Sequence, residues 1–220
     1  ALSMAKRSGD IYASAAANEL LPLVPQAQVL AMQFDAVVAN PPYMGSKYFN
    51  TSMKSFANKY FENSKSDLFA MFMERGFGWC KDSSYNSMIT MQTWMFLSSY
   101  ESMRESLLKN HSLTDLAHFP YDGKSPTVMG ISFGVTAFVL IAKQLPGYLA
   151  QFSCSRYYEL DDTGHPTQFP TQNERRCAVK TADLASIPGA PISYWTSTNA
   201  ASTFNHPKVG EKLKVLAGLT

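Results

Sequence analysis

The sequence predicts an α/β fold, specifically the C-terminal half of a mixed sheet whose last strand runs antiparallel. Two observations support this prediction. Short β-branched or aromatic runs alternate with amphipathic stretches of helical period, in the order β, loop, α, β, α, β, β. In addition, the first run, FDAVVA (34–39), ends at an asparagine followed by two prolines, as expected where a strand opens into a loop at the carboxyl edge of a sheet.

The first third of the chain contains a helical segment, a strand and a loop. Residues 1–30 begin with an alanine-rich helical stretch that Pro22 and Pro25 interrupt. FDAVVA has the apolar character of a buried parallel strand. Residues 45–66 are rich in Ser, Asn and Lys with aromatic residues between them, which predicts a long loop of the kind that carries function.

Two amphipathic helices are predicted after this loop. The first covers 66–80, with Ser66 as its N-cap. The second covers 98–111, where Ser98 and Glu101 have the spacing of a capping box. The apolar faces of the two helices are expected to contain Leu68, Phe72 and Trp79 in the first, and Met103, Leu107 and Leu108 in the second.

Three further strands are predicted at 85–92, 112–119 and 131–143, the last of them long. Beyond Lys143 the pattern fades into sequence rich in Pro, Gln, Thr and Ser. We expect a linker there that leads into a different module.

Composition sets few limits on the partner. The chain is 45% hydrophobic and 16% charged with a net charge of +2, so the overall charge neither requires nor excludes nucleic acid. The three cysteines lie far apart without a CxxC pair, so we expect no metal site, no disulfide framework and a reducing, cytoplasmic setting. No apolar run approaches the length of a membrane span, so no membrane partner is expected.

The segment Asn40-Pro41-Pro42-Tyr43 carries the strongest chemical signal. Pro41 keeps Asn40 out of the helical region, and both prolines have a fixed φ and no N–H group. The carbonyl oxygen of Pro41 is therefore presented beside the side-chain oxygen of Asn40, so that two acceptors converge. The alternative is a proline-rich strand exit whose tyrosine packs in the core.

Two convergent acceptors fit an amino group conjugated to a ring. Such a nitrogen is a poor nucleophile, and accepting both of its hydrogen bonds returns electron density to it and favours the tetrahedral geometry of attack. Tyr43 offers a flat ring on which a base can stack, an interaction worth about 1–3 kcal/mol.

The sequence resembles the S-adenosylmethionine-dependent amino-methyltransferases that carry an Asn-Pro-Pro-Tyr or Asn-Pro-Pro-Phe motif. Within them it is most similar to the adenine-specific DNA methyltransferases of the bacterial BREX phage-exclusion systems, from about residue 25 to residue 145. The resemblance rests on FDAVVANPPYMGSKYFN, SKSDLFAMFMERG, MITMQTWMFLSSYESMRESLL and FPYDGKSPTVMGISFGVTAFVL, with IPGAPISYW as a fainter echo.

The resemblance implies a Rossmann-like methyltransferase sheet and methyl transfer to the N6 amino group of an adenine flipped out of double-stranded DNA. Asn40 and Pro41 would hold the amino group, and Tyr43 would stack on the adenine, with Pro42 also contacting the substrate. Phe133 would supply a second aromatic ring, although a core phenylalanine in a buried strand is an equal alternative.

The segment 45–66 interleaves lysines with aromatic residues, which suits contact with DNA phosphates and bases. Lys47, nearest the motif, is the expected DNA contact. The alternative is a solvated flap whose aromatic residues tuck underneath. Asp67 is explained equally by helix capping and by a role in orienting cofactor or substrate.

The remaining histidines and tryptophans suggest no separate chemistry. His111 follows a predicted helix and His118 ends a predicted strand, and neither has an evident Ser or Asp partner. DGKS (122–125) lacks the glycine spacing of a phosphate loop and is interpreted as a turn. Trp94 and Trp195 are interpreted as packing residues.

The resemblance also implies that a glycine-rich cofactor motif should precede Asn40 by many tens of residues. Only 39 residues precede it, and none of them forms a glycine-rich turn. Asn40 would then contact only the edge of the cofactor site. We therefore expect a fragment of a longer chain that neither binds S-adenosylmethionine tightly nor catalyses alone, with one flank of FDAVVA left unpaired.

Three regions are expected: a helical lead-in at 1–30, the catalytic half of the methyltransferase domain at 31–145, and a linker with the start of a target-recognition or C-terminal module at 146–220. The expected partners are double-stranded DNA and other subunits of a phage-defence complex. Two other functions stay open. An Asn-Pro-Pro-Tyr methyltransferase could instead act on protein glutamine, on guanine amino groups or on RNA, and a non-catalytic DNA-binding scaffold could retain the fold.

Overall fold

The computed structural model describes residues 1–121, 123 and 131–207. The turn expected at 122–125 therefore falls mostly outside the described residues. The chain divides into two compact units, Ala1–Phe34 and Asp35–Thr220. No helix in the described part of the chain is both long and apolar enough to span a bilayer.

The first unit is helical, as predicted. It contains α1 (Leu2–Ala5), α2 (Ile11–Leu20), a 3₁₀ turn η1 (Leu21–Leu23) and α3 (Val24–Ala31). Asp10 caps α2 by accepting the backbone N–H of Tyr12 at 2.8 Å. Pro22 and Pro25 lie in the first turn of η1 and α3, where a missing N–H costs little, so each begins a new helical stretch.

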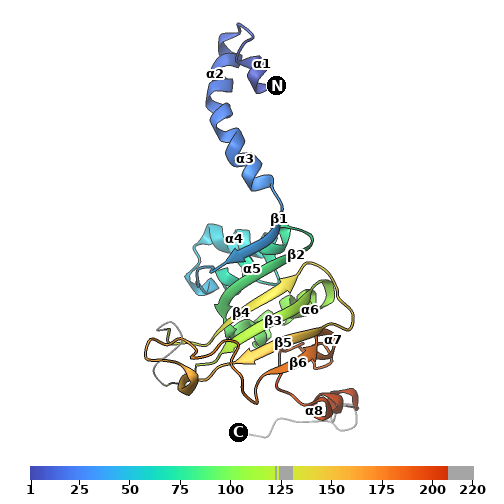
Figure 1. The fold of residues 1–220 in the computed structure, drawn as a ribbon. Coiled ribbons are helices and arrows are strands. Elements are labelled where there is room, and N and C mark those ends of the chain that lie inside the picture. Colours follow the sequence, from blue (N-terminus) through green and yellow to red (C-terminus); the bar gives the residue numbers. More distant parts are fainter. Residues whose placement is uncertain (122, 124–130, 208–220) are drawn as a thin grey trace. The chain divides into compact units, whose positions relative to one another are not determined.

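The second unit is built on a mixed sheet (Figure 1). Within the described residues six strands pair in the order β1-β2-β4-β3-β5-β6. β4 runs antiparallel to both β2 and β3, and β3 runs parallel to β5, so the predicted mixed sheet with an antiparallel strand is confirmed. The strands are β1 (Phe34–Ala39), β2 (Cys80–Met91), β3 (Ser112–Phe119), β4 (Val135–Ile141), β5 (Leu149–Cys154) and β6 (Cys177–Lys180).

β1 is not the buried strand that its sequence suggests. It stands at one end of the sheet as described, and the side chain of Val38 is 77% exposed. An end strand has only one neighbour to cover it, and an apolar flank of this kind is a pairing surface. The expectation of an exposed flank is therefore correct, and the expectation of burial is wrong for the residues described.

Regular structure continues beyond Lys143, where the sequence pattern fades. β5 pairs in parallel with β3, and β6 pairs antiparallel with β5, so both strands extend the same sheet. Each is short, and β5 carries polar residues, so its stability comes from its partners rather than from its own pattern. The start of a further module at residue 146 stays a prediction.

Segment 45–66 is largely helical, which corrects the predicted loop. It forms a 3₁₀ turn η2 (Ser46–Tyr48) and the helix α4 (Thr51–Tyr60). Asn50 caps α4 by accepting the backbone N–H of Met53 at 2.8 Å. Phe49 and Ala57 are buried against Met71, and this tertiary contact fixes a helix whose own sequence is polar.

The two predicted helices form as α5 (Leu68–Trp79) and α6 (Glu101–Asn110). Asp67, not Ser66, is the N-cap of α5. Phe69 and Met73 are among its most deeply buried residues, whereas the predicted Leu68 and Phe72 are partly buried and pack at the margin of the core. Trp79 is also only partly buried. The Ser98–Glu101 capping box is not formed, because Ser98–Tyr100 is itself a 3₁₀ turn, η4. The remaining short elements are η3 (Gln92–Met95), η6 (Tyr157–Glu159), α7 (Thr181–Leu184), α8 (Thr198–Ser202) and η7 (Thr203–Asn205).

The main core lies between the sheet and the two helices α5 and α6. Phe69 of α5 and Met103 of α6 share it with Phe138 of β4. Trp94 packs on Phe138 with ring centroids 5.2 Å apart, and its Nε1–H donates to Thr136 Oγ1 at 3.1 Å, so its predicted packing role is confirmed. Trp195, in contrast, is 58% exposed, and its ring contacts His118 and Tyr194, so it packs only in part.

Candidate active site

The motif Asn40–Tyr43 follows β1 directly and lies at the edge of the sheet where β2 ends. Tyr43 Oη is 3.4 Å from the carbonyl oxygen of Ile89, which is near the end of β2. Pro41 is buried, whereas Asn40 and Pro42 are exposed. Pro41, whose backbone is rigid, is thus anchored in the protein, and the carboxamide of Asn40 faces solvent rather than the core.

Tyr43 is held edge-on between two phenylalanines. Its ring centroid lies 6.0 Å from that of Phe69 and 5.5 Å from that of Phe133, with interplanar angles of 83° and 85°. Its hydroxyl lies 3.4 Å from Asn40 Oδ1 and can donate its one proton to that oxygen or to Ile89. Burial raises the pKa of Tyr43, so the phenol is neutral at physiological pH and can donate. The structure therefore brings Asn40, Tyr43 and Phe133 together.

Phe133 is half-buried and packs against a small apolar cluster that contains Phe119 and Val135. It precedes β4, so it is not the core residue of a strand. The predicted long strand at 131–143 begins only at Val135, which leaves Phe133 in the connection beside Tyr43.

Asp67 connects the motif to α5. Its Oδ1 accepts the backbone N–H of Met44 at 3.0 Å and that of Phe69 at 3.3 Å. The backbone N–H of Leu68 also donates to the carbonyl oxygen of Met44 at 3.0 Å. A buried carboxylate that joins the two segments in this way caps the helix and fixes where the chain leaves Tyr43. Asp67 therefore acts as a structural clasp in this arrangement.

Lys47 lies beyond the motif in η2 and is exposed. It lines a hollow of about 400 Å³ that also contains Lys54 and Lys65 and whose lining includes no acidic residue. Tyr48, next to Lys47, is 69% exposed with the Lys47 Nζ 4.8 Å from its ring centroid. The aromatic residues of 45–66 therefore fall into buried and exposed groups, with Phe49 buried and Tyr48 exposed.

A hydrogen-bond network that sequence reasoning did not predict lies at the same edge of the sheet. His118 Nδ1 lies 2.9 Å from Tyr194 Oη, and His118 Nε2 lies 2.7 Å from Gln92 Oε1. Burial first, and then the charge of Arg156, lower the pKa of His118 to about 4. The imidazole is therefore neutral near pH 7, with Tyr194 donating to Nδ1 and Nε2–H donating to Gln92. The only available signal was that Gln92 and His118 both stand at strand ends.

Gly134 connects this network to Phe133. The backbone N–H of Gln92 donates to the carbonyl oxygen of Gly134 at 2.9 Å. A Cβ at position 134 would lie 2.2 Å from the carboxamide of Gln92, so only glycine fits there. The position of the Phe133 backbone is thus fixed by its neighbour's contact with Gln92.

The cofactor site that the sequence resemblance implies has few candidate residues in the described part of the chain. Helices α1 to α3 occupy most of the chain before β1, and no glycine-rich turn precedes the strand in this stretch. Asn40 is the one motif residue expected to reach the edge of a cofactor site. The described residues before β1 therefore do not supply the expected glycine-rich cradle for S-adenosylmethionine.

Comparison with known proteins identifies the family to which a chain with this fold and motif belongs. The family model described as Eco57I restriction-modification methylase matches residues 10–124, which is more than half of the chain. The chain belongs to this family, and the resemblance noted from its motifs is confirmed.

Two relatives show the particular branch. The chain is 40% identical over 198 residues to the adenine-specific methyltransferase BrxX of Escherichia coli O9:H4 (strain HS), which covers 89% of this chain and 16% of BrxX. It is 35% identical over 185 residues to the adenine-specific methyltransferase PglX of Lacticaseibacillus casei (strain Zhang), covering 81% and 15%. The chain therefore spans only a small part of the length of both relatives.

A solved structure shows the same fold at lower identity. A chain from a study of complex assembly and conformational transition in the type I restriction-modification system superposes with a TM-score of 0.54 at 15% identity. The match covers 86% of this chain and 41% of that chain, and it includes more of the sequence than the family model does.

Proposed function

We propose that this chain is the substrate-binding part of a DNA methyltransferase that modifies the N6 amino group of adenine. One observation carries the proposal: the exposed carboxamide of Asn40 directly precedes a buried Pro41, with the rings of Tyr43 and Phe133 5.5 Å apart at the same point. Membership of a methylase family and two relatives that are adenine-specific methyltransferases support it.

Asn40 and Pro41 act on the amino group. The side-chain oxygen of Asn40 and the carbonyl oxygen of Pro41 accept its two hydrogen bonds, which raises electron density on nitrogen and holds it for attack. S-adenosylmethionine, when bound to the complete protein, supplies the electrophilic methyl group. Asn40 is the residue of this chain proposed to approach it, at the edge of its site.

Tyr43 and Phe133 hold the ring of the base. An adenine inside a duplex cannot reach Asn40, so the base must leave the helix and stack on an aromatic surface. Both rings are half-buried; the hydroxyl of Tyr43 lies 3.4 Å from Asn40 Oδ1, and Phe133 lies against Tyr43. Because the two rings are nearly perpendicular, a base that lies flat on Tyr43 is also nearly perpendicular to the ring of Phe133.

Lys47 contacts the DNA backbone in this proposal. Three lysines around one hollow, Lys47, Lys54 and Lys65, form a local positive surface despite the small net charge of the chain. Pro42, exposed between the buried Pro41 and Tyr43, lies where it would touch the sugar or base.

The complete protein is proposed to act in phage defence in the bacterial cytoplasm. The partners proposed for it are double-stranded DNA and other subunits of a defence complex. Residues 146–220 are proposed to lead into a target-recognition or C-terminal module, with β5 and β6 attaching its start to the methyltransferase sheet.

The test is an acceptor comparison with the full-length protein and radiolabelled S-adenosylmethionine. Duplex DNA, RNA and a glutamine-containing protein are offered separately, and the methylated product is digested and identified. We expect label in N6-methyladenine from DNA. Label in guanine, in RNA or in glutamine would assign the site to another substrate, and DNA binding without any transfer would support the scaffold function.

A further inference from the structure

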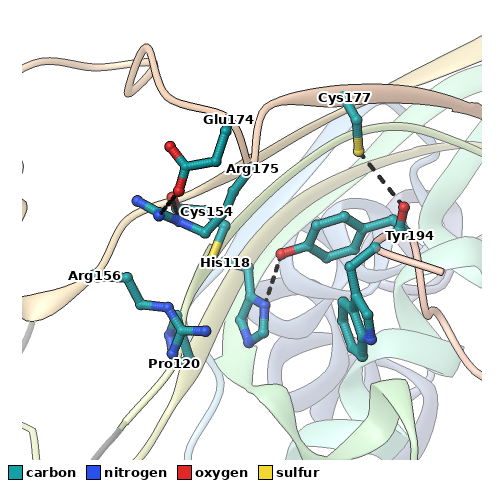
Figure 2. A pocket seen from close by; sticks show the side chains of 9 residues that line it. His118, Pro120, Cys154, Arg156, Glu174, Arg175, Cys177 and Tyr194 are labelled. Carbon is teal, nitrogen blue, oxygen red and sulfur yellow. Dashed lines mark hydrogen bonds and ion pairs between the residues drawn. The ribbon is translucent and has the colours of Figure 1, made fainter. Parts of the chain in front are cut away.

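A second cavity lies at the carboxyl ends of β3 and β5, apart from the Asn40 motif. It has a volume of about 520 Å³, within the roughly 300–1,000 Å³ of small-molecule sites. His118 and Cys154, at or near the ends of these strands, line it (Figure 2). The lining also includes two arginines and two aromatic residues, Arg156, Arg175, Tyr194 and Trp195.

The two arginines of the cavity differ in their partners. Arg175 is neutralised, because its Nη2 lies 2.6 Å from Glu159 Oε1 and its Nη1 pairs with Glu174. The guanidinium of Arg156 makes no hydrogen bond or ion pair with any residue that the structure describes. Arg156 is only partly exposed, and an unpaired cation in such a place favours an anionic ligand.

Trp195 gives the cavity an aromatic wall. Its ring is tilted by only 26° from that of His118, at 6.2 Å, and stands edge-on to Tyr194 at 4.9 Å. With 58% of its surface exposed, Trp195 leaves a large ring available for stacking. A planar ligand can lie on it without displacing protein.

The aromatic wall is fixed before any ligand arrives. Tyr194 is buried and stacks on Phe152 at 4.6 Å with an interplanar angle of 13°. The backbone N–H of Ile192 donates to the carbonyl oxygen of Met95 at 2.8 Å. Arg104 donates to the carbonyl oxygen of Gly189 through Nη2 at 2.7 Å, so the whole segment before Trp195 is held to the core.

His118 adds no charge and no free donor to the cavity. Its two ring nitrogens are bonded to Tyr194 and Gln92, and its lowered pKa keeps it neutral at pH 7. The ligand therefore meets one unpaired cation and one exposed aromatic ring. A nucleotide complements both features, because its phosphate is an anion and its base is a planar aromatic ring.

We propose that this cavity binds one nucleotide of the DNA, with its phosphate on Arg156 and its base on Trp195. That the nucleotide comes from DNA rests on the proposed function. It is not the target adenine, because Asn40 follows β1, and β3 and β5 stand three and four places away in the sheet. At about 4.8 Å per strand this is about 14–19 Å. One DNA strand carries a phosphate about every 3.4 Å along the helix axis, so this distance spans about four to six phosphates.

The test uses the full-length protein and a duplex that contains its target adenine. Arg156→Gln is expected to lower the slope of log K against log salt by about 0.9, the value for one phosphate contact, whereas Arg156→Lys keeps the slope. Trp195→Ala is expected to weaken binding at every salt concentration with the slope unchanged. Arg176→Gln, an exposed arginine outside this cavity, is the control and should change neither.

Neutral methylphosphonates locate the contact. A single substitution about four to six phosphates from the target adenine should weaken binding by the wild type and have no effect on Arg156→Gln. Equal changes of slope for Arg156→Gln and Arg176→Gln, or no position that distinguishes the wild type from Arg156→Gln, would overturn the proposal. Saturable binding of deoxyadenosine monophosphate that needs Arg156, with DNA binding unchanged, would show a free-nucleotide site and overturn the assignment to DNA.

The same experiment separates this proposal from the proposed function. Asn40→Ala should lose methyl transfer and keep both the salt slope and the methylphosphonate effect. A protein that shows the Arg156-dependent contact and never methylates DNA adenine retains the cavity assignment and loses the proposed function.

Discussion

The carboxylate of Asp67 accepts the backbone N–H of Met44 at 3.0 Å, which fastens the residue after Asn-Pro-Pro-Tyr to the first turn of α5. The same oxygen accepts the N–H of Phe69. One buried side chain thus determines both where the helix begins and where the chain leaves the proposed base-binding ring.

Removing this clasp should affect stability and activity together. Asp67→Ala loses the N-cap and the bond to Met44, and we expect a loss of about 1–2 kcal/mol in the free energy of unfolding. Methyl transfer should fall more than this loss alone explains, because Tyr43 is no longer held. Urea unfolding and methylation assays measure the two effects. Asp67→Asn keeps an acceptor oxygen and should lie between the wild type and Asp67→Ala; an Asp67→Ala protein with unchanged stability would contradict the role of the clasp.

The two rings of the proposed base site should contribute separately. Phe133→Ala and Tyr43→Ala each remove a surface for the flipped base, at a cost of about 1–3 kcal/mol in base stacking. Tyr43→Phe keeps the ring and loses only contacts of 3.4 Å, so its effect should be much smaller. The fluorescence of 2-aminopurine at the target position reports how the extruded base stacks. If the signal of the Phe133→Ala variant equals that of the wild type, Phe133 serves packing alone.

His118 should make stability depend on pH. Its pKa is about 4 in the folded protein against an ordinary value of 6.5, so the unfolded chain binds more protons between these values. The contribution, about 3 kcal/mol, is complete above pH 6.5 and is lost as the pH falls towards 4. Urea unfolding at several pH values measures it, and His118→Gln should flatten the pH dependence. A His118→Gln profile as steep as that of the wild type would assign the dependence to other groups.

Gly134 should tolerate no side chain. Gly134→Ala places a Cβ 2.2 Å from the Gln92 carboxamide and must displace it from His118. We expect a loss of about 1–3 kcal/mol in stability and weaker methylation, because Phe133 moves with its neighbour. Gly78→Ala is the control, since its Cβ would meet only the flexible end of Arg75 within a helix and should be neutral or stabilising. Equal stability of the two variants would contradict the close contact.

The sequence predicted the parts of the site whose chemistry is local. Asn40 to Tyr43 could be placed because a β-branched run followed by two prolines defines its own backbone. Helix α4 was missed because its sequence is polar, and what holds it is the burial of Phe49 and Ala57 against Met71. β5 and β6 were missed for a related reason, because their strands are short and are stabilised by partners distant in sequence.

The cavity at the ends of β3 and β5 was beyond reach of the sequence pattern. His118 and Tyr194 are separated by 76 residues, and neither has a motif that indicates the other. Trp195 looks like any core tryptophan until its exposure is measured. The unpaired state of Arg156 likewise depends on which arginine Glu159 and Glu174 contact.

The single-turnover rate of methyl transfer to duplex DNA by Asn40→Ala in the full-length protein tests the central claim most directly. Loss of one preorganised acceptor should lower this rate by about 10²–10³-fold. Affinity for DNA should stay nearly unchanged, and Asn110→Ala, which removes an exposed amide at the end of α6, should behave as the wild type. An Asn40→Ala enzyme that transfers methyl groups at the wild-type rate would contradict the account.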